Sequence, residues 1–329
     1  MKKLLGIIVI LMTMYNNLNA EVRIGSVTFK EVNSCEITQS VIELSDQAIV
    51  VLPRNYKNKI GESVLDVLQV GQKVSVSLGY NEELNEEFKG YVREIESDIP
   101  IKIHIDDEMY QFKRNNLVKS WKKVTLQEIL QATSKDMKID CPEVNLGKFI
   151  IDNESSYKVF MRLKQNYGLF TYVKDDVLHC GFPYQMSEKS YVTHEYEFGR
   201  NVKQNKLKYR RKEDIKLKVV AIANKKDGKK VKVELGNSGN DASVRTMNFG
   251  DVDETELRTL ANAELNKLCF DGYSGKIIGF GVPLTRAGDT LRIIDEKEKD
   301  REGNYLIESV KIRWGNAHFE RINKLSYKV

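Results

Sequence analysis

The chain has 329 residues, of which 41% are hydrophobic and 30% charged, and its formal net charge at pH 7 is +5. This balance excludes a disordered or fibrous chain and is typical of a soluble globular protein with two or three domains. The mild positive charge permits contact with acidic surfaces, but it does not by itself indicate nucleic-acid binding.

The first 20 residues resemble a secretory signal peptide. Lys2 and Lys3 precede a short apolar run over residues 4–12, and a small residue, Ala20, stands at the expected cleavage point. The run is too short to serve as a membrane anchor. Because Leu18 fits the cleavage pattern poorly, residues 1–20 are either a signal-like leader or a misassigned start at Met12 or Met14.

Residues 21–118 predict a first β-domain. Apolar and polar residues alternate over residues 22–29, and the apolar run 48–52 ends at Pro53, which cannot continue a strand ladder. Residues 99–112 predict two further strands with Asp106 and Asp107 at the turn between them.

A hairpin pattern within this range occurs a second time near the end of the chain. Residues 70–96 and 287–315 each begin with glycine and a polar residue (Gly71 and Gly288), followed by an alternating strand. A charged turn comes next, over residues 81–87 in the first copy, and a return strand closes each hairpin. The two stretches are either ordinary unrelated hairpins or the mark of a duplicated β-domain.

Residues 119–190 predict a small α/β module. Thr125 and Glu128 have the spacing of a capping box before a short helix, and Ser155 is placed to cap a second helix that ends at Gly168. A hairpin follows, with Asp175 and Asp176 at its turn.

Residues 191–329 predict a second β-domain that contains one amphipathic helix. Strands are expected over residues 191–198, 215–223, 230–235 and 243–249, with a turn at Asp227 and Gly228. Asp253 begins the helix, which places leucine and alanine side chains on one face. The predicted fold class is therefore α+β and mainly β, with two β-barrel or β-sandwich domains that flank the α/β module.

The sequence contains no pattern that indicates catalysis, a metal or a cofactor. The four histidines are scattered, the four cysteines lack metal-ligand spacing, and the sequence has no phosphate-binding or dinucleotide-binding glycine motif. The acidic pairs, such as Asp106 with Asp107, are better explained as turn residues than as an acid and base. We therefore assign no catalytic, cofactor-binding or metal site, and we expect the protein not to be an enzyme.

The strongest charge feature is the basic stretch over residues 203–218, followed by more lysines up to residue 232. The alternation of apolar residues and lysines over residues 215–219 predicts that these lysines lie on one solvated strand face. The functional alternative is a positive face that meets a partner protein or passing nucleic acid.

The order of a β-domain, an α/β module and a second β-domain resembles the baseplate hub proteins of phage tails, including the late control protein D and Mu-type hub families. The likeness covers most of the chain from about Val22 onwards. It rests on order and spacing in five stretches, residues 52–56, 71–92, 205–218, 281–289 and 303–306.

The resemblance implies two tail-tube-like β-domains in one polypeptide and a non-enzymatic homotrimer. Three copies would offer six similar positions, which suits a symmetry adaptor between a hexameric tail tube protein and a trimeric central spike protein, in a contractile injection system or phage tail. A tape-measure protein is a further implied partner, and nucleic acid would enter only as the passing genome. The implied location is the virion tail baseplate, assembled in the host cytoplasm, with no membrane anchor.

Two other functions stay open on the sequence alone. Taken at face value, the leader favours a secreted or periplasmic β-rich protein that binds a glycan or an envelope partner. An enzyme is the weaker alternative, because the chain shows no acidic pair or metal set of the kind that a cell-wall hydrolase needs.

Overall fold

The computed structural model describes residues 17–53, 64–134, 137–181, 192–225, 227–315 and 317–329. Most of the predicted leader, including Met12 and Met14, lies outside these residues. Residues 18–20 are described, and they form the start of the first strand. Among the described helices, none is both long enough and apolar enough to cross a bilayer.

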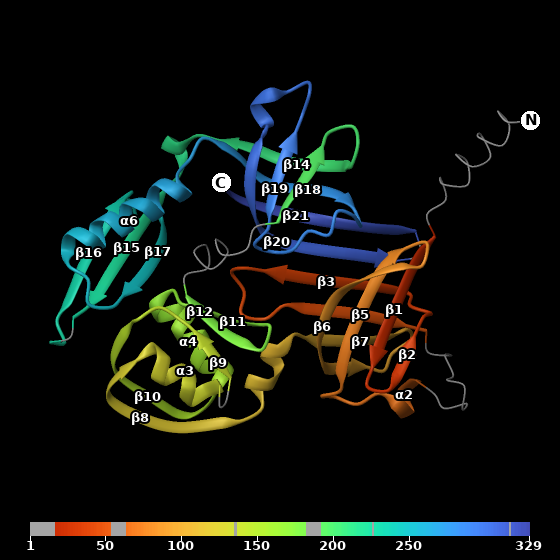
Figure 1. The fold of residues 1–329 in the computed structure, drawn as a ribbon, viewed down its shortest axis with the longest axis horizontal. Coiled ribbons are helices and arrows are strands. Elements are labelled where there is room, and N and C mark those ends of the chain that lie inside the picture. Colours follow the sequence, from red (N-terminus) through yellow and green to blue (C-terminus); the bar gives the residue numbers. More distant parts are fainter. Residues whose placement is uncertain (1–16, 54–63, 135–136, 182–191, 226, 316) are drawn as a thin grey trace, which may run out of the picture.

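The fold is of the α+β class and mainly β, as predicted, and its largest element is a sheet of 13 strands (Figure 1). The sheet runs through both predicted β-domains. Its strands are β1 (Leu18–Ile24), β2 (Val27–Phe29), β3 (Ser34–Ser40), β4 (Gln47–Leu52), β5 (Lys73–Tyr80), β6 (Glu83–Glu96), β7 (Ile101–Asp106), β13 (Thr193–Glu197), β14 (Val202–Arg210), β18 (Gly272–Phe280), β19 (Thr290–Ile294), β20 (Gly303–Gly315) and β21 (His318–Lys328).

Two sets of six strands within this sheet have the same topology. Module 1 consists of β1 and β3–β7, and module 2 consists of β13, β14 and β18–β21. If the strands of each module are numbered along the chain, both modules have the spatial order 1-4-5-6-3-2. Neighbouring strands are antiparallel in both modules, with one difference: β13 runs parallel to β19, whereas β1 is antiparallel to β5.

The repeated hairpin is the centre of each module and matches residue by residue. The amide of Gly71 donates to the carbonyl of Val92 at 2.8 Å, and the amide of Gly288 donates to the carbonyl of Ile307 at 2.8 Å. Both glycines have positive φ, at 89° and 95°, a conformation that favours glycine. A register irregularity then follows Val92 in the β6–β7 ladder and Ile307 in the β20–β21 ladder. Val92 and Ile307 therefore occupy equivalent positions, and the hairpins are two copies of one arrangement.

Two predicted turns are wrong in detail. The turn of the first hairpin is limited to Asn81 and Glu82, because both adopt positive φ (52° and 70°) and so close the hairpin with two residues. Asp106 and Asp107 do not form a hairpin turn either. The Asp107 carboxylate accepts a hydrogen bond from the amide of Met109 at 3.1 Å and caps a 3-10 helix, η1 (Glu108–Lys113), in place of a second strand.

Between the two modules the chain forms the predicted α/β unit, with two additional strands, one before its first helix and a short one directly after it. Its elements are β8 (Asn116–Thr125), α3 (Leu126–Ser134), β9 (Lys138–Asp140), β10 (Asn145–Ser155), α4 (Ser156–Tyr167), β11 (Phe170–Lys174) and β12 (Val177–Gly181). The capping box is confirmed: Glu128 accepts from the amide of Thr125 at 2.7 Å, and Thr125 Oγ1 accepts from the amide of Glu128 at 3.3 Å. The predicted Ser155 cap is also confirmed.

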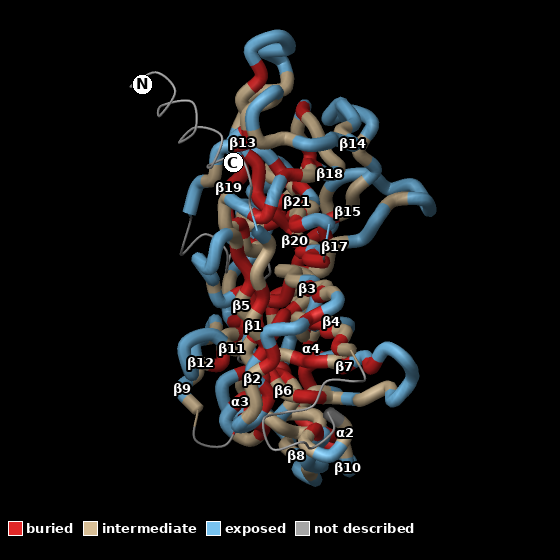
Figure 2. The backbone as a smooth tube through the Cα atoms, turned by 90° about the vertical axis from the view of Figure 1, so that its right-hand side faces the viewer, coloured by how far each residue is buried: buried red, intermediate tan, exposed pale blue. Residues whose placement is uncertain are grey.

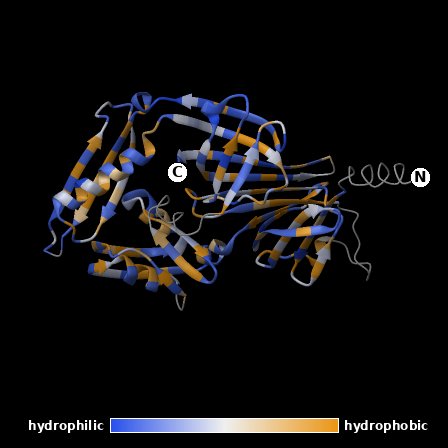
Figure 3. Cartoon of the chain, turned by 45° about the horizontal axis from the view of Figure 1, so that its top comes forward, coloured by the Kyte–Doolittle hydropathy of each residue, from blue (hydrophilic) through white to orange (hydrophobic). Residues whose placement is uncertain are grey.

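A second small sheet interrupts module 2. Between β14 and β18 the chain forms β15 (Leu217–Asn224), β16 (Lys230–Gly236), β17 (Ser243–Phe249) and α6 (Glu254–Leu268). Asp253 caps α6 as predicted. In Figure 3 apolar and polar residues alternate along many strands, as expected for strands with one buried face.

The inserted sheet shares a hydrophobic core with the α/β unit. Val219, Met247 and Leu257 of the insert and Phe160 of α4 belong to one buried cluster, separate from the cluster of the large sheet. The backbones meet closely at Gly168, where a Cβ would overlap the carbonyl oxygen of Thr246. Figure 2 shows buried segments running through the middle of the molecule. Each hydrophobic core therefore contains residues from more than one predicted domain. The division of the chain into domains stays a prediction.

Candidate functional site

The two modules meet where β3 pairs with β20. Residues Ser309–Gly315 of β20 extend past β19 and pair antiparallel with Ser40–Ser34 of β3. Glu36 on β3 binds two cations of β20 on the solvent side, Lys311 at 2.5 Å and Arg313 at 3.4 Å. On the core side of the same ladder, Trp314 and Cys35 are 4% and 2% exposed. The ladder therefore has an acidic member on β3 and basic members on β20.

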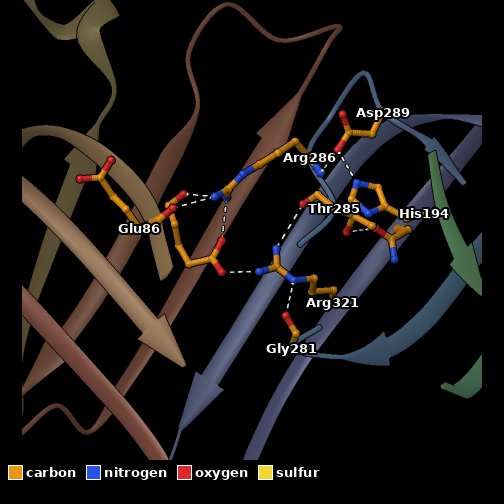
Figure 4. A network of polar contacts seen from close by, with 9 residues as sticks. Glu86, His194, Gly281, Thr285, Arg286, Asp289 and Arg321 are labelled. Carbon is orange, nitrogen blue, oxygen red and sulfur yellow. Dashed lines mark hydrogen bonds and ion pairs between the residues drawn. The ribbon is translucent and has the colours of Figure 1, made fainter. Parts of the chain in front are cut away.

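A buried ion network reinforces this junction (Figure 4). Arg321 of β21 is fully buried, and its guanidinium binds the carboxylate of Glu87 on β6. It also donates to the carbonyls of Gly281 at 2.6 Å and Thr285 at 3.2 Å. Burial lowers the pKa of Arg321 and the nearby Glu87 opposes that effect. These contacts satisfy a charge that would otherwise be costly to bury.

Arg286 binds the same carboxylate from the solvent side. Its guanidinium is 2.6 Å from Glu87 Oε2 and donates to the carbonyls of Glu86 and Glu87 at 2.7 and 3.0 Å. Its own amide donates to Asp289 at 2.8 Å, and Asp289 contacts Nε2 of His194 at 2.9 Å. The network therefore links β6 of module 1 to β13 and β21 of module 2. Its ion pairs and hydrogen bonds hold the two modules in a fixed relative position.

A cleft of about 550 Å³ lies beside the network. Its lining includes four carboxyl groups, among them Asp46 and Asp107, together with Arg286 and His194. Burial, followed by the charge of Asp107, raises the pKa of Asp46 to about 8, and burial raises the pKa of Asp107 to about 6. Asp107 nevertheless accepts hydrogen bonds from Ser45 Oγ at 2.8 Å and from the amide of Asp46 at 2.9 Å. The pair thus holds the loop after β3 against the start of η1.

The raised pKa values predict that these two carboxyls make the fold less stable as the pH rises. The unfolded chain releases their protons near pH 4, whereas the folded chain keeps them up to about pH 6 for Asp107 and pH 8 for Asp46. Their stabilising effect is therefore full below pH 4 and is lost towards pH 8. We expect Asp46→Asn to become more stable relative to the unchanged protein between pH 5 and pH 8, measured by urea unfolding. Asp152→Asn, at an exposed position, is the control. A difference that does not change with pH would contradict this assignment.

The histidines do not form a common site. His104 contacts Glu96 at 2.6 Å, His179 contacts Asp140 at 3.0 Å, and His194 contacts Asp289 as described above. Within the described residues, no group of three or more histidine, cysteine or acidic side chains is placed to hold a metal ion. All four cysteines are free, and burial raises the pKa of the Cys180 thiol to about 12. The absence of catalysis stays a prediction.

The basic stretch forms an edge of the large sheet. Its first part is β14, whose side chains Lys206, Lys208 and Arg210 are exposed. In the stretch 215–219, where a solvated lysine face was predicted, Lys216 is exposed and Lys218 is half-buried. On the described part of the chain β14 pairs only with β18, so its other edge is open. The second part enters the inserted sheet, where Lys218 pairs with Glu234 at 2.5 Å.

No protein-family model and no curated protein matches the chain, whereas many solved structures do. The 43 kDa tail protein of prophage MuSo2 from Shewanella oneidensis is 15% identical, with a TM-score of 0.60 over 94% of this chain and 98% of that one. A tail protein from Neisseria meningitidis is 12% identical, with a TM-score of 0.60 over 94% of this chain and 96% of that one. The chain has the fold of phage tail proteins.

The same fold extends to secretion machines. An Escherichia coli component of the type VI secretion system is 10% identical, with a TM-score of 0.58 over 93% of this chain and 76% of that one. At such identities the likeness establishes the tail-protein fold, which confirms the resemblance inferred from the order of the sequence elements. Sequence reasoning missed the junction network, although one signal was present. Arg321 and Asn323 occupy positions of β21 where the alternation otherwise places buried apolar residues.

Proposed function

We propose that the protein is a structural hub subunit of a phage tail or a related injection machine. The observation that carries this proposal is the second use of one six-strand topology within a tail-protein fold. Three chains with two equivalent modules each would provide six similar positions around an axis, and closed rings require matched interfaces of this kind. Such a ring would join a hexameric tail tube on one side to a trimeric spike on the other.

The proposed partners follow from this role. They are two further copies of the chain, the tail tube protein, the central spike protein and the tape-measure protein, within a virion tail assembled in the host cytoplasm. The junction network supports the role, because it holds the two modules at a fixed angle, as a rigid ring needs. Passing nucleic acid would be the only nucleic-acid contact.

Sedimentation analysis of the full chain tests the proposal. We expect a species with three times the chain mass of 37.9 kDa that grows with protein concentration. A trimer should also bind a tail tube protein, whereas a monomeric chain should not. A chain that stays monomeric at every concentration, with and without the tube protein, would contradict the hub assignment.

A further inference from the structure

The cleft beside the junction network has an open strand edge as one of its walls. β11 stands at the end of its sheet, in the order β11-β12-β9, so in the described part of the chain no strand pairs with its outer edge. Every residue of β11 lines the cleft. Because successive side chains of a strand point to opposite faces, a cleft lined by the whole strand faces its backbone edge. Open edges of this kind can accept an extended segment of another protein.

The other walls place apolar side chains along this edge. Val41 lies in the loop after β3, and Leu284 lies in the loop after β18. Both are half-buried, as is Val173 of β11. The cleft has about the volume of a pocket that encloses a small ligand, so it holds a few residues of extended chain and not a folded domain.

The four carboxyl groups that line the cleft differ in their partners. Glu43 contacts the amine of Lys164 at 2.9 Å, and Asp289 belongs to the junction network. Asp46 and Asp107 accept hydrogen bonds from amides and a hydroxyl group, and within the described residues neither is paired with a cation. Two carboxyl groups without a counter-ion therefore lie beside the open edge.

The cations of the cleft do not neutralise these two groups. The guanidinium of Arg286 is held by Glu87 and two carbonyl groups, and burial raises the pKa of Asp46 more than Arg286 lowers it. Lys174 is exposed. On the same lining, the buried side-chain oxygen Oε1 of Gln39 has no hydrogen-bond partner among the described residues. A ligand that brings a positive charge and hydrogen-bond donors would satisfy both groups.

We propose that an extended segment of another protein adds as a strand to β11 and places one arginine or lysine side chain in the cleft, against Asp46 and Gln39. Such a side chain supplies several donors together with a positive charge. The backbone of the segment would pair with the open edge, and its apolar side chains would contact Val41 and Leu284. The site uses surfaces of one chain only, so it does not depend on the number of subunits in the proposed hub.

A peptide probe tests the charge and the strand. A short labelled peptide of alternating valine and threonine with one central arginine should bind the full chain at pH 8 about tenfold more tightly than the same peptide with a central glutamate, measured by fluorescence polarisation. Two further versions carry N-methyl groups on the amides of one edge or of the other. Only one of them should lose binding, because an added strand donates from a single edge. Amide exchange in β11 should slow when the arginine peptide is bound.

Asp46→Asn locates the charge, since it removes the carboxylate but keeps an oxygen for the amide of Ser40. It should remove most of the preference for arginine over glutamate. The preference should also weaken at pH 6 in the unchanged protein, because the pKa of Asp46 is raised to about 8, by burial above all, and its carboxyl is then protonated. Asp152→Asn, at an exposed position, is the matched control and should bind both peptides like the unchanged protein.

Three results would overturn the proposal. If the arginine and glutamate peptides bind equally, or neither binds, the cleft does not select a basic segment. If the arginine peptide binds but exchange in β11 is unchanged, no strand is added. If spermidine displaces the peptide at an equal concentration, the cleft takes a small polyamine instead. Sedimentation of the unchanged protein tests the hub separately, so either idea can fail while the other stands.

Discussion

Glu87→Ala should lower the free energy of unfolding by about 3–5 kcal/mol, the typical cost of leaving a buried charge without its partner. Arg321 is fully buried and would keep only the carbonyl oxygens of Gly281 and Thr285 as acceptors. Arg286 would lose its strongest contact as well. Urea unfolding at pH 7 measures the effect.

The neighbouring residue supplies the control. Glu86 is exposed and contributes only its carbonyl to Arg286, so Glu86→Ala should change the free energy of unfolding by less than about 0.5 kcal/mol. A double change, Glu87→Leu with Arg321→Met, removes both charges and should be more stable than Glu87→Ala alone. If the double variant is as unstable as the single one, the cost comes from lost packing and not from an unpaired charge.

Phe160→Ala should cost about 3–5 kcal/mol, as expected for removing a fully buried aromatic side chain. Phe160 packs edge-on against Phe112 of η1 at a centroid distance of 5.3 Å, in the core that the α/β unit shares with the insert. We therefore expect faster amide exchange both in α4 and in β17, although β17 begins 76 positions after the end of α4.

Met161→Ala is the matched control, because the next residue on the same helix is 39% exposed. It should leave both the stability and the exchange pattern nearly unchanged. Faster exchange in α4 with unchanged exchange in β17 would mean that the insert is stable by itself. That result would contradict a single shared core.

The features that were predicted correctly from the sequence depend on local patterns of residues. The helix caps at Thr125, Ser155 and Asp253 were predictable because each depends on residues within three positions of the cap. The repeated hairpin was visible for the same reason, since a glycine, an alternating strand and a return strand lie within about 30 residues. The sequence did not predict the exact extent of the turn at Asn81 and Glu82. The acidic residues that follow are typical of a turn, but they belong to β6.

Long-range pairing explains what the sequence did not reveal. β14 and β18 are neighbours in the sheet although residues 211–271 separate them, and no local pattern marks such an insertion. The junction network has the same origin, since Glu87 and Arg321 are 234 positions apart. Glu87 lies in an acidic stretch that is typical of solvent-facing chain, so its burial depends on a strand at the other end of the molecule.

The charges on β3, β14 and β20 have a consequence for how two copies of the chain can meet. β3 presents Glu36 at the junction and β20 presents Lys311 and Arg313, whereas the open edge strand β14 presents Lys206 and Lys208. If β14 met β20 of a second copy, like charges would oppose each other across the ladder. This distribution of charge disfavours joining two copies of the chain through their second modules.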